Sequence, residues 1–157
     1  MLMKEYPDIW IVLDSKVEDA EDIKKQYGNM IQIAERLEVQ EVLDRLIIQL
    51  YNEEMYEVVN QIYPFKEYIF TLYRRWDGSL EEFTQLCRWS VAHDVDIITM
   101  WADLANDDVL KVAERYDIDV YVHTVNNCDD ALGFLKRGVK GIYTDFIIPS
   151  ELEEEKR

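Results

Sequence analysis

Short apolar runs alternate with longer amphipathic segments along the whole chain. The runs lack the polar alternation of a half-exposed strand, so each predicts a β-strand that is buried on both faces. We expect such strands at residues 8–14, 46–51, 68–73 and 95–100, and a short strand that runs into a polar loop in each of the segments 119–126 and 138–145. Strands that alternate with helical segments indicate βαβ units, in which neighbouring strands run parallel. The pattern therefore predicts an α/β fold with a mainly parallel sheet.

The intervening segments carry apolar residues at the spacing of about 3.6 residues that is typical of an amphipathic helix. The first segment covers residues 17 to about 38, and Gly28-Asn29 is a candidate break within it. Later helices have clear start signals: Asn52 and Asn106 are good N-caps, and Ser79-Leu-Glu-Glu82 has the pattern of a capping box. Each strand is thus expected to alternate with a helix.

Composition limits the size of the fold. The chain has 157 residues, of which 48% are hydrophobic, and this is enough for one compact core. No linker rich in Pro, Gly or Ser interrupts the six βα steps, so we expect one domain over residues 1–150 and an acidic tail over residues 151–157. A complete (β/α)8 barrel does not fit, because such barrels typically need about 250 residues.

Charge and cysteine usage exclude several classes of partner. The formal net charge of −16 argues against nucleic acid, because phosphate backbones are bound through excess Lys and Arg. No apolar run approaches the roughly 18 residues of a membrane span, and the first residues lack a signal-peptide core. Cys87 and Cys128 are isolated thiols without a metal or redox spacing, which fits a reducing compartment. We therefore expect a cytoplasmic protein.

Polar residues follow the last two strands, where an α/β protein places its chemistry. His123-Thr-Val-Asn126 is followed, after a helical segment, by Gly138-Val-Lys-Gly-Ile-Tyr-Thr-Asp145. These segments resemble the end of the glycerophosphodiester phosphodiesterase domain, whose last two strands usually read Trp-Thr-Val-Asn and Gly-Val-(any)-Gly-Ile-(any)-Thr-Asp. The similarity extends to residue type, order and spacing.

This resemblance implies a partial TIM barrel of about six βα units, matching strands three to eight of the family. The family's reaction is metal-dependent hydrolysis of glycerophosphodiesters in lipid metabolism, with Mg²⁺ or Ca²⁺ as cofactor. Its catalytic histidines and further metal ligands lie on the first two strands, which have no counterpart here. Only His93 and His123 are present, and neither has such a setting. Whether the chain is an enzyme therefore stays open: we expect a truncated form that is inactive on its own, and the alternative is a non-catalytic binding or assembly module.

The resemblance also suggests site residues at strand ends. The family's third strand ends in Glu-(any)-Lys, and here Asp14-Ser-Lys16 stands at that position. Residues i and i+2 of an extended chain share a face, so Asp14 would face a metal and Lys16, as the catalytic residue, the phosphate. Asp is one methylene shorter than Glu, which weakens the expected metal site.

Each of the other strand-end residues has two interpretations, one functional and one structural. Gln49 matches a Gln common in the family's fourth strand, or it hydrogen-bonds a neighbouring strand. His123 replaces a Trp that lines the family's substrate site, or it is a packed core histidine. Trp101, like Tyr51 and Tyr73, could stack on a substrate or could pack under a loop. The basic pair at residues 74–75 could attract a phosphate or form a solvated loop.

The predicted sheet has two unpaired edges, at residues 8–13 and 141–144. Closure of a barrel normally removes such edges, and an unpaired edge is a template for pairing with another chain. We therefore expect a homo-oligomer that forms through its open sheet edges, with a phosphodiester small molecule as the other partner.

Overall fold

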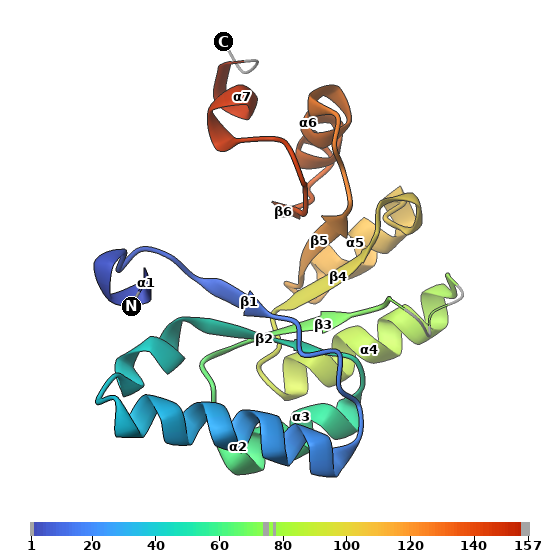
Figure 1. The fold of residues 1–157 in the computed structure, drawn as a ribbon. Coiled ribbons are helices and arrows are strands. Elements are labelled where there is room, and N and C mark those ends of the chain that lie inside the picture. Colours follow the sequence, from blue (N-terminus) through green and yellow to red (C-terminus); the bar gives the residue numbers. More distant parts are fainter. Residues whose placement is uncertain (1, 74–75, 77, 155–157) are drawn as a thin grey trace. The chain divides into compact units, whose positions relative to one another are not determined.

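The computed structural model describes residues 2–73, 76 and 78–154. The chain divides into two compact units, Met1–Thr71 and Leu72–Arg157, which Figure 1 shows in blue to green and in green to red. Each unit contains three strands that alternate with helices, so each repeats the same βα pattern. Within the described residues, none of the helices is both long and apolar enough to cross a bilayer.

The first unit is a parallel three-stranded sheet. Ile11 of its first strand is in register with Leu46 of the second, and Ile48 is in register with Tyr68 of the third. Large side chains from both the helices and the strands are fully buried and form its core, among them Ile23, Tyr27, Leu43, Ile48 and Met55. The elements are α1 (Leu2–Glu5), β1 (Ile11–Leu13), α2 (Ala20–Arg36), η1 (Gln40–Arg45), β2 (Leu46–Leu50), α3 (Glu53–Ile62) and β3 (Glu67–Thr71).

The second unit repeats this arrangement. Thr99 pairs with Tyr121, and Tyr121 with Gly141, so its three strands are also parallel. Its core contains fully buried side chains such as Phe83, Cys87, Val95, Ile98, Met100 and Val122. The elements are α4 (Leu80–Ala92), β4 (Ile97–Trp101), η2 (Ala102–Leu104), α5 (Asp107–Arg115), β5 (Asp119–His123), α6 (Cys128–Lys136), β6 (Gly141–Ile142) and α7 (Pro149–Glu154).

All six predicted strands and the α/β class are confirmed, but some boundaries and the candidate helix break were wrong. The strand at residues 8–14 is shorter than expected and covers only β1. Helix α2 runs through Gly28-Asn29 without a break, because Ile23, Tyr27 and Ala34 continue one buried stripe across it. Burial of that stripe outweighs the cost of about 1 kcal/mol for a mid-helix glycine. Helices α1 and η1 were not predicted, and α7 includes Glu151, the first residue of the expected acidic tail.

The predicted N-caps are present. Asn52 Oδ1 accepts a hydrogen bond from the Met55 amide at 2.8 Å, and Ser79 Oγ accepts one from the Glu82 amide at 3.4 Å. Such caps satisfy backbone donors that the first helical turn leaves without partners. The starts of α3 and α4 are therefore fixed by local sequence.

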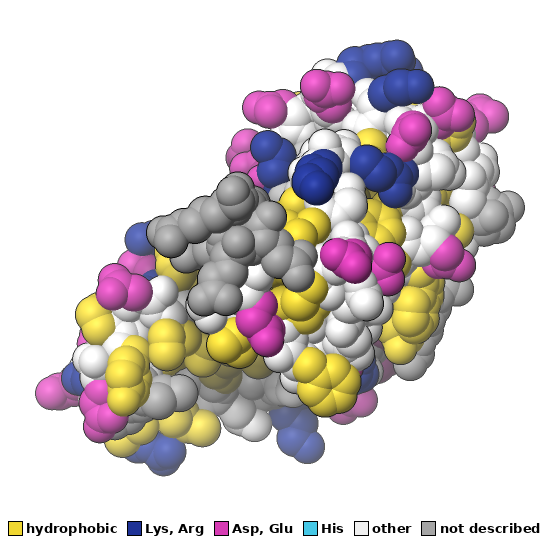
Figure 2. All heavy atoms as spheres, turned by 90° about the horizontal axis from the view of Figure 1, so that it is seen from above, with side chains coloured by type: hydrophobic (Ala, Val, Ile, Leu, Met, Phe, Trp, Pro, Cys, Tyr) yellow, Lys and Arg dark blue, Asp and Glu magenta, His cyan; other side chains and the backbone are white. Residues whose placement is uncertain are grey.

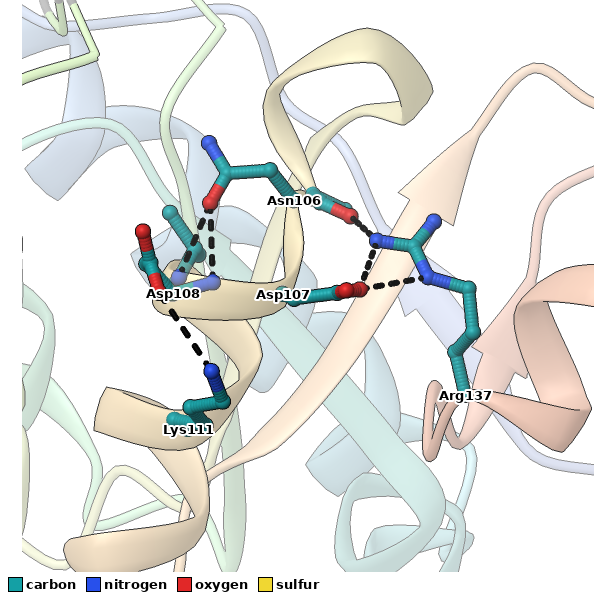
Figure 3. A network of polar contacts seen from close by, with 7 residues as sticks. Asn106, Asp107, Asp108, Lys111 and Arg137 are labelled. Atoms are coloured by element: carbon teal, nitrogen blue, oxygen red, sulfur yellow. Dashed lines mark hydrogen bonds and ion pairs between the residues drawn. The ribbon is translucent and has the colours of Figure 1, made fainter.

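Figure 3 shows how the start of α5 is held. Asn106 Oδ1 accepts a hydrogen bond from the Asp108 amide at 3.0 Å, as predicted. Arg137, at the end of α6, donates from Nε to Asp107 Oδ1 at 3.0 Å and from Nη2 to the Ala105 carbonyl at 2.7 Å. The start of α5 is thus capped by its own asparagine and tied to the end of α6.

Four helices end in the same turn, which we call the helix-to-strand turn. In each, the residue after the C-cap has a positive φ, and the amide of the next residue donates back to the helix, as in a Schellman motif. That next residue is buried and apolar in all four turns. The positive-φ residues are Glu38 (φ 53), Asp94 (φ 53), Asp117 (φ 58) and Gly138 (φ 102). The returning bonds are Val39 to Ala34 (2.9 Å), Val95 to Ser90 (2.9 Å), Ile118 to Ala113 (3.0 Å) and Val139 to Phe134 (3.1 Å).

Two glycines of α6 and its turn should respond in opposite ways to replacement by alanine. A Cβ at Gly133 or at Gly138 would meet no atom within 4 Å, so only the backbone differs, with φ +102 at Gly138. We expect Gly133→Ala to raise the free energy of unfolding by about 0.5–1 kcal/mol, because alanine is the better helix former. Gly138→Ala should lower it by about 1 kcal/mol, because an L-residue is strained at positive φ. Urea titrations measure the free energy of unfolding of both variants. A change of the same sign in both would contradict the prediction.

The side chain of Arg45 holds the segment before β1. Its guanidinium, at the end of η1, donates to the backbone carbonyls of Met3, Tyr6 (3.0 Å), Pro7 (2.8 Å) and Ile9 (3.1 Å). A guanidinium carries five N–H donors in a fixed fork, which allows it to bind several carbonyls at once. This contact sets the entry of the chain into β1, and hence the position of the residues that follow β1.

Candidate functional site

Asp14 and Lys16 lie at the carboxyl end of β1, together with two residues from β2 and its end. Lys16 Nζ is 2.6 Å from Asp14 Oδ2, and the Tyr51 hydroxyl donates to Asp14 Oδ1. Gln49 Nε2 donates in turn to the Tyr51 hydroxyl at 3.3 Å. We call these four residues the Asp14 cluster. Protein donors engage both oxygens of its one carboxylate.

In the Asp14 cluster, Asp14 and Lys16 each stabilise the charged form of the other. Partial burial acts to raise the pKa of Asp14, but the hydrogen bonds from Lys16 and Tyr51 and the Lys16 charge outweigh it and lower the pKa below its usual value. The hydrogen bond to Asp14 raises the pKa of Lys16, and burial together with the hydrogen bond to Asp14 raises that of Tyr51. At neutral pH the cluster therefore holds a carboxylate, an ammonium and a neutral phenol.

The backbone of Lys16 is unusual among the described residues. Its φ is 58, whereas the other non-glycine residues with positive φ (Glu38, Asp94 and Asp117) each end a helix. Backbone held in a sparsely populated region is frequent at functional sites, where the surrounding structure imposes it. The Lys16 side chain is nevertheless 61% exposed, so its ammonium can reach a ligand.

The Asp14 cluster does not fit a divalent metal. Ca²⁺ takes about six to eight oxygen ligands, and Mg²⁺ requires a near-ideal octahedron. The cluster offers one carboxylate, whose two oxygens are both engaged. In the part of the chain that the structure describes, no group of three or more His, Cys, Asp or Glu side chains could hold a metal ion. The described residues alone therefore support no metal-assisted step.

The second unit brings four aromatic side chains together at strand ends. Trp101 and His123 are the last residues of β4 and β5, are in register, and have ring centroids 4.7 Å apart. The Tyr73 ring lies 4.9 Å from that of Trp101 and 5.5 Å from that of His123, and the Tyr143 ring lies 6.1 Å from that of His123. We call these four residues the aromatic cluster. It unites two predicted substrate-binding residues, Trp101 and His123.

The remaining strand-end residues hold a loop. Asn126 Nδ2 donates to Asp145 Oδ2 at 3.0 Å, and Asn126 Oδ1 accepts from the Asp145 amide at 2.9 Å and from the Thr144 hydroxyl at 3.1 Å. These bonds join the segment after β5 to the segment after β6. Their role is to fix the loop geometry, as Asn and Asp commonly do in turns.

Several other candidates lie elsewhere. His93 is the C-cap of α4, with Nδ1 2.7 Å from the Trp89 carbonyl. It therefore lies near the start of β4 and not at its end.

Burial raises the pKa of the Cys87 thiol to about 12, which makes it a poor nucleophile. A groove of about 550 Å³ beside α5 is lined by residues such as Asp117 and Gly138 and lies at the amino end of β5. The basic pair at residues 74–75 lies outside the described residues.

Sequence reasoning missed the roles of Tyr51 and Tyr143. Tyr51 was predicted to stack on a substrate or to pack under a loop, yet its hydroxyl donates a hydrogen bond to Asp14. The alternation of Gln49 and Tyr51 in the Gln-Leu-Tyr segment placed both on one face and was the available signal. Tyr143 follows β6 in Gly-Ile-Tyr-Thr-Asp, where a strand-end tyrosine could have been noted in the same way.

Comparisons with known proteins place this fold. The model of the glycerophosphoryl diester phosphodiesterase family matches residues 1–148. A search among curated proteins finds no match. A solved structure from Silicibacter pomeroyi, assigned as a glycerophosphoryl diester phosphodiesterase, is similar with a TM-score of 0.69 and 15% identity, over 92% of this chain and 50% of that one.

Two further solved structures are also similar in fold to this chain. A glycerophosphodiester phosphodiesterase from Parabacteroides distasonis has a TM-score of 0.67 and 17% identity, over 97% of this chain and 59% of that one. A phosphodiesterase from Oleispira antarctica, solved with its product sn-glycerol 3-phosphate, has a TM-score of 0.62 and 10% identity, over 84% and 49%. The expected partial barrel is thus confirmed as a fold, and the chain spans about half the length of these proteins.

Proposed function

Because the chain belongs to the glycerophosphoryl diester phosphodiesterase family, we propose that it carries part of a glycerophosphodiester site in which Lys16 faces the phosphate. The observation that carries this proposal is the Lys16 ammonium, which is held by Asp14 at the end of β1 while its side chain stays 61% exposed. The Oleispira antarctica phosphodiesterase, which shares the fold, was solved with sn-glycerol 3-phosphate. That ligand supports a phosphate group as the recognised chemistry.

Each residue of the Asp14 cluster has a part in holding the phosphate. An ammonium has three donors, so Lys16 can keep one on Asp14 and direct another to a phosphoryl oxygen. Asp14 raises the pKa of Lys16 and so keeps it charged. The Tyr51 hydroxyl fixes the Asp14 carboxylate from its other oxygen, and Gln49 holds that hydroxyl. Asp14, Tyr51 and Gln49 are therefore positioning residues, and Lys16 is the residue that contacts the ligand.

Hydrolysis of the phosphodiester needs further groups. The family typically uses a divalent metal, and the described residues do not supply a set of ligands for Mg²⁺ or Ca²⁺. The family's catalytic histidines lie on strands that have no counterpart here, and His93 and His123 have other settings. We propose that these 157 residues, taken alone, bind the phosphate but do not turn over substrate.

Binding of sn-glycerol 3-phosphate tests the proposal, and the chain offers a matched control. Lys16 and Lys66 are both 61% exposed and both pair with an aspartate, at 2.6 Å and 2.8 Å. A hydrogen bond to a charged group contributes about 1.5–3 kcal/mol, so Lys16→Met should weaken binding at least about tenfold while Lys66→Met leaves it unchanged. Titration followed by NMR measures both. Equal losses in the two variants would mean that only net charge matters.

The alternative, an assembly module without catalysis, is favoured by the sheet edges. Among the described residues, β1 pairs with β2 alone and β6 with β5 alone. Unpaired strand edges expose backbone donors and acceptors that a second copy could pair with. Light scattering of the same samples at micromolar concentration distinguishes the two functions. Oligomers that bind no sn-glycerol 3-phosphate would favour the assembly module, and a monomer that binds it through Lys16 would rule that module out.

A further inference from the structure

Two buried hydroxyls, those of Tyr27 and Ser15, lie next to the Asp14 cluster in the first unit. Tyr27 of α2 is fully buried, and its ring packs against Phe65 with ring centroids 6.0 Å apart. Burial raises the pKa of Tyr27, and the nearby Ser15 hydroxyl opposes that rise. The two hydroxyls are therefore close, but among the described residues neither oxygen has a partner in hydrogen-bond geometry. Buried polar groups nearly always have a partner, so this pair requires an explanation.

The two hydroxyls lie beside the unusual backbone of Lys16. Its φ of 58 belongs to a sparsely populated region, which persists where the surrounding structure imposes it. The Lys16 side chain is a flexible stem, so its ion pair with Asp14 does not by itself require this backbone. Lys16 is exposed, whereas Ser15 before it turns its hydroxyl oxygen away from solvent. Ser15 is thus the residue through which the core can act on the Lys16 backbone.

We infer that Tyr27 is a positioning residue of the Asp14 cluster, and that its hydroxyl holds Ser15 and so fixes the backbone that carries Lys16. A neutral phenol donates one hydrogen bond, and a serine hydroxyl can accept it. Because the ring of Tyr27 is fixed in the core, this bond would tie the segment after β1 to helix α2. The inference rests on the proposed function only in naming a phosphate as the group that Lys16 faces. The effect on the Lys16 backbone can be measured without any ligand.

Tyr27→Phe tests the inference, because it removes the hydroxyl and keeps the ring that packs against Phe65. In NMR spectra of the full chain without ligand, we expect the HN–Hα coupling and the ¹³Cα shift of Lys16 to leave their positive-φ values. Binding of sn-glycerol 3-phosphate should weaken by about threefold or more. Tyr68→Phe is the matched control, since Tyr68 is buried in the same unit and its hydroxyl likewise has no hydrogen-bond partner among the described residues. That control should change neither the Lys16 signals nor the binding.

Ser15→Ala provides a second, independent variant, and it keeps the test valid if Tyr27→Phe does not fold. If the two hydroxyls act as a pair, Ser15→Ala should reproduce the effect of Tyr27→Phe, and the double variant should add nothing to either. The Lys16 signals are needed besides ligand binding, because Lys and Arg side chains lie at several places on the face shown in Figure 2. Each of these cations attracts a phosphate to some extent.

The outcomes separate this inference from the proposed function. Lys16 signals that move in Tyr27→Phe and Ser15→Ala but not in Tyr68→Phe support the positioning role. If the chain then binds no sn-glycerol 3-phosphate, only the proposed function is overturned. Unchanged Lys16 signals in Tyr27→Phe or in Ser15→Ala overturn the inference and leave the phosphate site standing. Equal effects of Tyr27→Phe and Tyr68→Phe, or additive effects in the double variant, overturn it as well.

Discussion

The 157-residue chain on its own should hydrolyse neither glycerophosphocholine nor an activated aryl phosphodiester above background, with or without Mg²⁺ or Ca²⁺. General acid–base catalysis by a positioned side chain contributes about 10²–10⁴-fold, and metal activation adds several kcal/mol of charge stabilisation. His93 is bonded to a helix carbonyl, and His123 is stacked among rings. Asp14 has both oxygens engaged by protein donors. Phosphodiesterase assays over a range of pH measure this.

Supplying the missing part of the barrel should reverse this result. If the first two βα units of a relative are fused or added, some activity should return, and Lys16→Met should abolish it while Lys66→Met does not. Turnover by the chain alone that disappears in His123→Ala would contradict the truncated-barrel proposal. It would make His123 the catalytic residue.

Phe83→Ala should lower the free energy of unfolding of the second unit by about 3–5 kcal/mol. The Phe83 side chain is fully buried in α4 and packs against Trp76, with ring centroids 5.5 Å apart. Truncation removes a large apolar surface and leaves a cavity that the surrounding side chains fill only in part. The denaturation midpoint in urea, followed by circular dichroism, gives the change.

A control for this prediction lies on the same helix. Val91 is 50% exposed, so Val91→Ala should change the stability by about 0.5 kcal/mol or less. A similar loss in both variants would contradict core packing as the cause of the Phe83 effect, because alanine is a better helix former than either phenylalanine or valine.

The strands and the helix starts could be predicted because their causes are local. Strands buried on both faces appear as unbroken apolar runs, and Asn52, Ser79 and Asn106 bond to amides two or three residues away. Helix α1 and η1 carry no such signal. What fixes their surroundings is Arg45, whose bonds span 36 to 42 residues of sequence. The pattern of one segment does not indicate such a partner.

The candidate site also has features that the sequence could predict and features that it could not. The resemblance at Asp14-Ser-Lys16 was enough to predict that Asp14 and Lys16 lie together, although they follow β1 and Lys16 is not extended. Strand-end positions were enough to single out Trp101 and His123. The bond from Tyr51 to Asp14 joins residues 37 apart and depends on the register of β1 against β2. Sequence alone does not supply that register. It therefore could not reveal that a phenol already engages the expected metal ligand.

In the second unit, the helix-to-strand turns should couple the exchange of amide hydrogens at a helix end to the strand that follows. The amides of Val95, Ile118 and Val139 donate back into the preceding helix, while their side chains are buried just before the next strand. Because the same residue anchors the start of the strand, we expect such an amide to exchange mainly when the helix end and the start of the following strand open together. Each of these helices and the strand after it should therefore open as one cooperative unit. Protection of the amides from hydrogen exchange should then change at the strand ends and not at the helix ends.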